Sequence, residues 1–373
     1  MHRPRFQPGG YVAGPAEWSK LDLGAIRRAL GAHPDPAELA RRAKRSRYVV
    51  GRFHNEEPTS LALDASPARV AAQMVFGGEI RVPGTPLPVL PRTGAELARH
   101  SGTGLRTTWL GHSSVLVEIE GVRILTDPVF SERIGPSPVI GPRRFHPVPV
   151  SVPELPPLDA ILVSHDHYDH LDLATIDALA PRGERFVVPL GVGTHLRAWG
   201  IADERIVELD WWEEVAIRDG VRIRALPSRH FSGRGPNDRM RTLWASWALL
   251  GREKKVFFSG DTGYHGSFGR IGEEVGPFDL AMLEVGAFHP AWWRIHLGPE
   301  NASRAFGELG AKLFLPIHWG TYSLAMHHWW DPIEGVLSHF GGRGHRFATP
   351  RPGESVEPGV SLPDDAWWRP FVR

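Results

Sequence analysis

Short apolar runs alternate with polar or helical segments from about residue 105 onward. Segments with the spacing of amphipathic helices follow several of these runs, at residues 171–180 and 299–309. Strands that alternate with helices predict an α/β fold in which helices cover sheets. The apolar runs that we expect to form buried strands lie at residues 107–110, 114–119, 123–125, 160–163, 186–188, 221–226, 255–258, 280–283 and 313–316.

The first 104 residues have a different texture. They are rich in Pro and Gly, and we expect one short helix in them, near residues 35–45. The chain has 373 residues, which suits a single large α/β domain with additions. We therefore expect an N-terminal extension at residues 1–104, a main α/β domain at residues 105–350 on which it packs, and a C-terminal tail at residues 351–373.

Charge and composition narrow the class of protein. Lys and Arg total 43 against 42 for Asp and Glu, so no broad positive surface for nucleic acid is expected. The chain has 0 Cys, which excludes disulfides and thiolate metal ligands. Residues 1–18 lack an apolar signal core, and no run reaches the ~18 apolar residues of a membrane span, so we expect a cytoplasmic protein.

Two features leave contact with a membrane surface open. The basic run at residues 41–47 could meet an anionic bilayer, although a solvated helix end explains it as well. The 14 Trp include four adjacent pairs, which could pack the core or could form an interfacial belt or an acyl-chain pocket. Peripheral membrane contact is thus an expectation that the sequence allows.

A cluster of metal-ligand side chains follows the apolar run at residues 160–163. It contains His165, His167, Asp169 and His170. Beyond a strand end, alternate residues of an extended loop project to one side, and we expect His170 to open the next helix and turn back toward them. Imidazole and carboxylate ligands without thiolate suit zinc, with manganese or iron as alternatives.

Three further candidate ligands, His230, Asp261 and His318, each follow another strand-like run. Strand ends are where α/β sheets usually place ligand sites. We expect one metal on His165, His167 and His230, a second on Asp169, His170 and His318, and Asp261 as the bridge. Two cations ~3.5–4 Å apart can lower the pKa of a shared water toward ~7, which predicts hydrolysis.

A carboxylate at another strand end completes this prediction. Asp127 follows the apolar run at residues 123–125. A metal-bound histidine usually donates its second ring nitrogen to an acceptor that fixes its tautomer. We expect Asp127 to be such an acceptor.

The run from Ser164 to Asp172 resembles the H-x-H-x-D-H motif of the metallo-β-lactamase superfamily. More narrowly, the chain resembles the branch of N-acylphosphatidylethanolamine-hydrolysing phospholipases D over about residues 87–337. The segments that carry this resemblance lie at residues 108–113, 125–128, 141–145, 208–214, 260–264 and 317–321.

The resemblance implies an αββα sandwich with two zinc ions on the seven ligands named above. It also implies attack of metal-bound hydroxide on a phosphodiester, which yields phosphatidic acid and an N-acylethanolamine. His296 matches a histidine that lies near the substrate phosphate in that branch, so we expect it to donate a proton to the leaving alkoxide. His289 departs from the branch, which favours an acidic residue there, and the first 80 or so residues show little match.

Other functions compete with a lipid phosphodiesterase. A lactonase of a phosphorylated sugar acid would use the same metals, and its pocket would hold clustered Arg instead of apolar side chains. A nuclease needs a basic clamp, and the interval from His170 to His230 leaves no room for an inserted domain. A non-catalytic metal-binding protein would need a missing ligand, and none is missing. The Trp pairs favour the lipid substrate.

Several other side chains could approach the centre. His112 could face the metals or cap a turn, and the pair at residues 327–328 could line the pocket rim. Tyr264 could present a hydroxyl to substrate or be structural. Arg143 and Arg144 could bind a phosphate or remain solvated.

Overall fold

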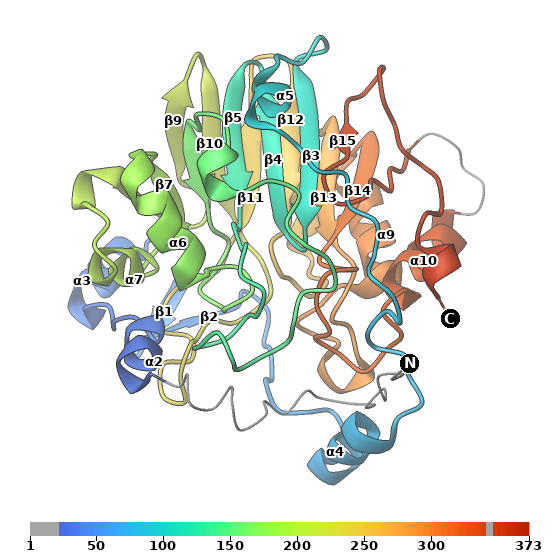
Figure 1. Ribbon diagram of the computed structural model, residues 1–373. Helices are drawn as coiled ribbons and strands as arrows, with labels where there is room; N and C mark the ends of the chain where they lie inside the picture. Colours follow the sequence, from blue (N-terminus) through green and yellow to red (C-terminus); the bar gives the residue numbers. More distant parts are fainter. Residues whose placement is uncertain (1–21, 341–345, 373) are drawn as a thin grey trace.

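The computed structural model describes residues 22–340 and 346–372, in which two mixed sheets face each other (Figure 1). One sheet has seven strands in the order β15-β3-β4-β5-β6-β7-β8, and the other has six in the order β14-β13-β12-β11-β10-β9. The first consists of β3 (Leu105–Gly111), β4 (Ser114–Ile119), β5 (Val122–Thr126), β6 (Ala160–Leu162), β7 (Phe186–Pro189), β8 (Ile206–Leu209) and β15 (Ser355–Val356). The second consists of β9 (Glu214–Arg218), β10 (Val221–Leu226), β11 (Ser246–Leu250), β12 (Lys255–Phe258), β13 (Leu280–Glu284) and β14 (Leu313–Ile317).

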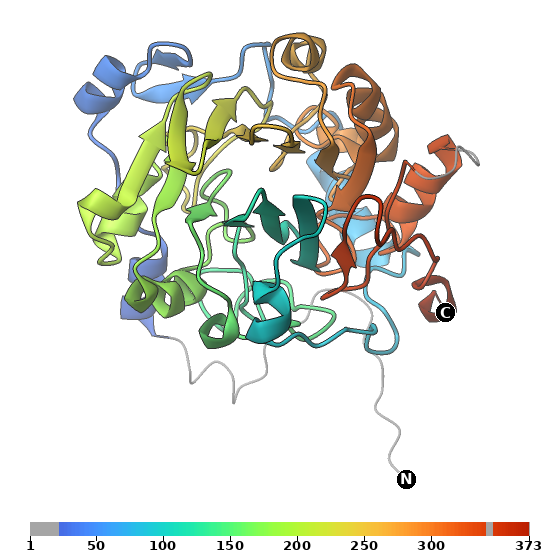
Figure 2. The same cartoon turned by 90° about the horizontal axis from the view of Figure 1, so that it is seen from above.

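Helices cover the outer face of each sheet, which makes four layers (Figure 2). The seven-stranded sheet carries α5 (Gly94–Ala98), α6 (Leu173–Leu179) and α7 (Gly193–Ala198), whose apolar residues share a buried cluster with it. The six-stranded sheet carries α8 (Ser267–Glu274), α9 (Gly298–Glu308) and α10 (Asp331–Phe340). The expected αββα sandwich with an N-terminal extension is confirmed.

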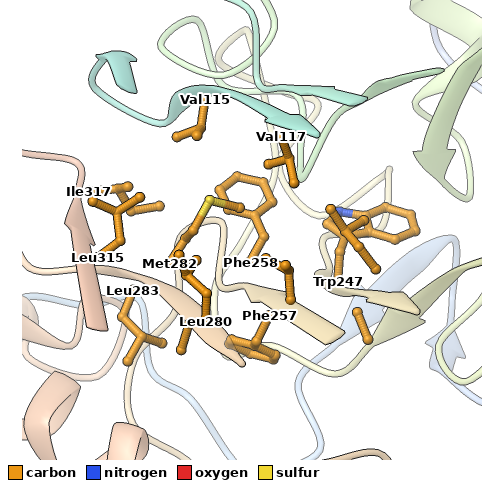
Figure 3. Close-up of a cluster of buried hydrophobic side chains, with 14 of the residues drawn as sticks. Val115, Val117, Trp247, Phe257, Phe258, Leu280, Met282, Leu283, Leu315 and Ile317 are labelled. Carbon is orange, nitrogen blue, oxygen red and sulfur yellow. The ribbon is translucent and has the colours of Figure 1, made fainter. Parts of the chain in front are cut away.

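The largest core lies between the two sheets (Figure 3). Val115 and Val117 of β4 point toward Phe258 of β12 and Met282 of β13. Phe257 points the other way and packs on Phe268 of α8, with ring centroids 6.2 Å apart. Because successive side chains alternate between the faces and both faces are covered, these strands read as continuous apolar runs.

The extension contains more regular structure than expected. Instead of one helix it holds α2 (Leu23–Ala29), α3 (Pro36–Arg42), α4 (Pro67–Phe76) and α5, with a hairpin of β1 (Arg47–Val49) and β2 (Arg52–His54). Asp22 and Asp35 begin two of these helices by accepting hydrogen bonds from Gly24 N and Ala37 N. Such seven-residue helices are too short for a clear periodic signal. Residues 1–21 of the expected extension lie outside the described residues.

The basic run at residues 41–47 anchors the extension. The Arg42 guanidinium lies 2.9 Å from a Glu208 carboxylate oxygen. Backbone N–H groups of Lys44, Arg45 and Ser46 donate to the Asp210 carboxylate at 2.7, 2.6 and 3.1 Å. This segment therefore joins the extension to the end of β8.

The length of the helices and the position of the C-terminal segment complete the description of the fold. Of the helices in the described ranges, none is long and apolar enough to cross a membrane. At the other end of the chain, β15 pairs with β3, and Trp368 is fully buried in the main core. Single-turn helices lie at Val152–Glu154, Ala180–Arg182, Asp203–Arg205, Pro290–Trp292 and Arg369–Phe371.

Candidate metal centre

The candidate ligands gather where strands of both sheets end. Strands β5, β6 and β7 run parallel in one sheet, and β12, β13 and β14 run parallel in the other. The carboxyl ends of parallel strands meet at one edge of a sheet, so loops distant in sequence converge there. The segments that converge follow β5, β6, β10, β12 and β14 and carry Asp127, the run 164–170, His230, Asp261 and His318.

The first ligand group consists of three histidines. His165 Nε2 lies 2.9 Å from His167 Nδ1, and His230 Nε2 lies 3.3 Å from the same nitrogen. Three ring nitrogens that converge in this way offer three ligands to one cation. These are the residues that the sequence assigned together to one metal.

The second group converges on Asp169. Its Oδ2 lies 3.4 Å from His170 Nε2, 3.3 Å from His318 Nε2 and 3.1 Å from His112 Nε2. Asp169, His170 and His318 are the residues predicted to hold the second metal. His112 joins them, and its ring is packed on that of His318 with centroids 4.1 Å apart. The sequence left open whether His112 faces the metals or caps a turn, and the structure places it at the centre.

Asp261 lies between the two groups. Its Oδ1 is 3.2 Å from His170 Nε2 and 3.1 Å from His318 Nε2. Its Oδ2 is 3.8 Å from His230 Nε2 in the first group. One carboxylate oxygen therefore faces each set of histidines, as a bridging ligand requires.

The donor atoms fit divalent cations. His170 Nε2, His318 Nε2 and Asp261 Oδ1 are buried, and although the two nitrogens lie 3.2 and 3.1 Å from the oxygen, none of the three atoms makes a hydrogen bond of acceptable geometry among the described residues. A buried polar atom left without a partner costs ~1–3 kcal/mol, and a cation would remove that cost at all three atoms. Burial also lowers the pKa of His165 and His230 well below the usual range, which keeps both rings neutral and able to coordinate.

A second layer of polar groups holds the ligand rings. Asp127 Oδ2 lies 2.6 Å from His170 Nδ1. The same carboxylate accepts bonds from Ser164 N and Ser164 Oγ, both at 2.6 Å. His230 Nδ1 lies 2.9 Å from the Ile295 carbonyl oxygen. Such partners fix which ring nitrogen faces the metal, the role that the sequence assigned to Asp127.

The backbone is unusual at this edge. His112, Asp127 and His318 adopt φ values of 55°, 33° and 63°, which few residues other than glycine adopt. At Gly260 (φ 54°) a Cβ atom would lie 2.5 Å from Ser164 Cβ, so only glycine fits before Asp261. Strained backbone of this kind persists where the surrounding packing over-determines it.

A buried carboxylate orients His296. Glu284, at the end of β13, accepts bonds from Thr262 N at 3.1 Å and Leu297 N at 3.0 Å through Oε1. Its Oε2 lies 3.1 Å from His296 Nδ1. The His296 ring centroid is 5.2 Å from that of His230 and 5.6 Å from that of His318, so the ring stands beside both ligand groups. Glu284 was not among the residues predicted from the sequence, although its position as a charged residue at the end of an apolar strand is a signal that could have revealed it.

A buried arginine supports the metal loop from behind. Arg234 donates through Nη1 to the carbonyls of Asp166 and Leu171, at 2.6 and 2.8 Å. It also donates through Nε to the Ala29 carbonyl at 2.8 Å, and its guanidinium lies between the rings of Tyr168 and Trp199. The helix α2 of the extension is thereby tied to the loop that carries four ligands.

The Asp166 side chain forms a second link between the metal loop and the extension. Its Oδ2 lies 3.2 Å from His195 Nε2, and His195 Nδ1 accepts from Ala32 N at 3.1 Å. Neither Arg234 nor His195 belongs to a recognisable local motif, and neither was predicted from the sequence.

The remaining candidate residues fall into two groups, one beside the centre and one bonded to other parts of the protein. His327 lines a narrow cavity together with His318, Tyr322 and Arg81. Tyr264 instead donates to Glu308 at 2.6 Å. Arg143 is an exposed partner of Glu132, and buried Arg144 donates to the Val129 carbonyl and to the Leu110 carbonyl.

Comparison with known proteins agrees with this fold. A family model described as a beta-lactamase superfamily domain matches residues 122–319. The chain belongs to this superfamily, and its fold and His/Asp centre define a metal-dependent hydrolase that uses divalent ions. Isothiocyanate hydrolase from Delia radicum gut bacteria shares the fold, with a TM-score of 0.55, 21% identity, and coverage of 67% of this chain and 98% of that one.

Two relatives place the chain more narrowly. An uncharacterized protein of Mycobacterium tuberculosis (strain ATCC 25618 / H37Rv) is 42% identical over 98% of both chains. The N-acyl-phosphatidylethanolamine-hydrolyzing phospholipase D 1 of Caenorhabditis elegans is 40% identical over 60% of this chain and 66% of its own length. The predicted resemblance to that branch of the superfamily is confirmed.

Proposed function

We propose that this protein is a two-zinc phosphodiesterase of the phospholipase D type that acts on N-acylphosphatidylethanolamine-like lipids. The observation that carries the proposal is the pair of histidine groups bridged by Asp261, with His296 beside both. The 40% identity to the nematode phospholipase supports this substrate class. The cytoplasmic location and the absence of a nucleic-acid partner stay predictions.

The ligands would be divided as the geometry groups them. His165, His167 and His230 would hold one ion, Asp169, His170 and His318 the other, and Asp261 would bridge. When bound, the two ions would supply Lewis acidity toward the phosphate and an activated water. Manganese and iron are the alternatives to zinc for this set of nitrogen and oxygen ligands.

The protein groups would position the proton transfer. Water adds to phosphorus, the bond from phosphorus to the ethanolamine oxygen breaks, and that oxygen must gain a proton. Glu284 holds Nδ1 of His296, which leaves His296 Nε2 to donate this proton. Phosphatidic acid and an N-acylethanolamine are the products.

A panel of substrates tests this assignment. Purified protein loaded with zinc is offered an N-acylphosphatidylethanolamine, a glycerophosphodiester and a phosphorylated sugar lactone. We expect turnover of the first, with appearance of the N-acylethanolamine. Turnover of the lactone alone would overturn the proposal, because it would show that the centre attacks a carboxylic ester.

Metal content tests the bridge separately. Asp261→Asn should lower bound zinc below the ~2 ions per chain expected of a binuclear centre and lower activity by more than ~100-fold, the upper loss for an outer-shell partner. Asp364→Asn, at an exposed position of the C-terminal segment, is the matched control and should change neither. Full activity and two ions in Asp261→Asn would contradict the bridging role.

A further inference from the structure

The segment at residues 63–82, here called the arch, borders the cavity beside His318, which its Arg81 lines. At one end Asp64 N donates to the Ala291 carbonyl at 2.9 Å. At the other end Ile80 N lies 2.9 Å from His328 Nδ1, and Trp329 N donates to the Ile80 carbonyl at 3.0 Å. The arch therefore joins the loop that leads to His296 with the loop that follows His318.

Helix α4, the middle of the arch, has no buried residue. Figure 1 shows it apart from both sheets, below them in that view. Met74, Val75 and Phe76 at its C-terminal end are 54%, 67% and 85% exposed. A short helix gains most of its stability from packing an apolar face, so a helix whose apolar side chains meet water lacks a partner in the folded chain.

Other apolar side chains extend this surface. Leu63, Ile80 and Val82 of the arch are at least 40% exposed, and Trp293 on the adjoining loop is 47% exposed. Trp293 is the one exposed member of the four tryptophan pairs. A ring of this kind suits the interface between water and lipid headgroups, whereas Trp211, Trp329, Trp367 and Trp368 pack in the core.

We propose that the arch and Trp293 form a membrane-docking surface that places the cavity beside His318 next to a phospholipid bilayer. The seven exposed apolar side chains are too few for a stable second copy, because a standard protein interface uses ~20–30 residues on each side. A bilayer requires no complementary shape, and a short apolar helix with a polar opposite side can insert at its surface. Arg81 links this surface to the cavity beside His318, which it lines.

The charges of the arch indicate which lipid headgroups the docking requires. Arg69 and Arg81 are balanced by Asp64 and Glu79, so residues 63–82 carry no net charge. Asp64 is paired with Arg294, and Gln73 donates to Glu79 at 3.0 Å. We therefore expect docking through apolar burial, with zwitterionic lipid sufficient and anionic lipid adding little.

Vesicle sedimentation tests the docking surface without turnover. The full-length protein is mixed with phosphatidylcholine vesicles, or with phosphatidylcholine and phosphatidylserine, and the bound fraction is measured. A Val75→Glu/Phe76→Glu variant should reduce binding to both by at least ~10-fold, since two apolar side chains no longer enter the bilayer. Val360→Glu, at a residue 70% exposed and far from the arch in sequence, is the matched control and should bind like the parent.

Three outcomes would overturn the inference. These are equal vesicle binding by the parent and the double variant, binding that requires phosphatidylserine and vanishes in high salt, and a parent dimer that the double variant loses. Because no side chain of α4 is buried, the double variant should keep the parent's melting temperature, which shows that it folds.

The docking surface rests on the proposed function in one respect only, namely that the bilayer supplies the lipid substrate. A water-soluble, short-chain phosphodiester separates the two. If the double variant loses vesicle binding while it hydrolyses this ester at the parent's rate, both proposals hold. If the parent binds vesicles through the arch but hydrolyses no phosphodiester, the proposed function fails and the docking surface stands.

Discussion

The metal centre and the arch lie at the same end of the molecule but are built in opposite ways. His165, His170 and Asp261 are almost completely buried. Further residues fix these side chains, as Asp127 does through its contact with His170 Nδ1. The arch is attached through its ends, and its helix buries no side chain. One region is over-determined by packing, and the other is held by a few hydrogen bonds.

The proposed function would place two different requirements on these two regions. Ligand rings must stay within a fraction of an ångström of their working geometry, which dense packing and second-layer bonds provide. A surface that meets a fluid bilayer needs no fixed geometry, and a loosely attached helix can adapt to it.

The largest contrast is in stability. Phe258→Ala should lower the free energy of unfolding by ~3–5 kcal/mol, because Phe258 is fully buried between the sheets (Figure 3). Phe76→Ala removes the same atoms from the arch and should change it by less than ~0.5 kcal/mol, because Phe76 is 85% exposed. Urea unfolding of the two variants measures both values. A large loss in Phe76→Ala would show that α4 packs on the body.

The next effect concerns proton transfer by His296. Glu284→Gln preserves the shape of the side chain but removes the carboxylate that faces His296 Nδ1. We expect kcat toward an alkyl phosphodiester to fall ~100-fold, the lower range of general acid catalysis, with KM little changed.

A second substrate separates this role from a structural one. An aryl phosphodiester has a leaving group that departs without a proton, so Glu284→Gln should lose much less activity toward it. Glu308→Gln, whose carboxylate binds the Tyr264 hydroxyl outside the centre, is the matched control. Equal losses on the two esters would point to a damaged metal centre instead of a misplaced acid.

The arginine behind the metal loop should have a smaller effect. Arg234→Lys keeps the positive charge but loses the planar fork that reaches the Asp166, Leu171 and Ala29 carbonyls. We expect the zinc dissociation constant to rise ~10-fold, the lower end for an outer-shell change, as measured by competition with a chelator. Arg239→Lys, at an exposed arginine of the same loop, should leave it unchanged. An unaltered constant in Arg234→Lys would show that the loop holds its geometry unaided.

The sequence predicted the parts of the centre that depend on local patterns. The seven expected ligands lie together because each sits in a short motif or directly after an apolar strand, such as Asp261 after β12. The strands at 114–119, 221–226 and 255–258 have the expected bounds because a buried apolar residue recurs at every second position or more often. In β9 no residue is fully buried, charged Glu214 and Arg218 stand at its two ends, and the strand was missed.

The residues that could not be predicted act through tertiary contacts. Arg234 meets a carbonyl more than 200 positions away in the sequence, at Ala29, and no local pattern encodes that distance. Helix α4 lacks an apolar stripe that packs on the body, so its segment resembled the irregular chain around it. The position of the extension thus depends on single buried contacts, which a periodic pattern does not reveal.

The remaining effect is a pH dependence at the edge of the buried region. Burial, with Arg144 nearby, lowers the pKa of His146 to about 3, against ~6.5 in the unfolded chain. Between these values the unfolded chain binds a proton that the folded protein does not, so folding stability falls as the pH falls. His146→Gln should therefore reduce the slope of unfolding free energy between pH 6 and 4 by at most ~1.4 kcal/mol per pH unit. Above pH 7 the two curves should run parallel, and parallel curves at every pH would show that His146 takes up its proton in the folded state.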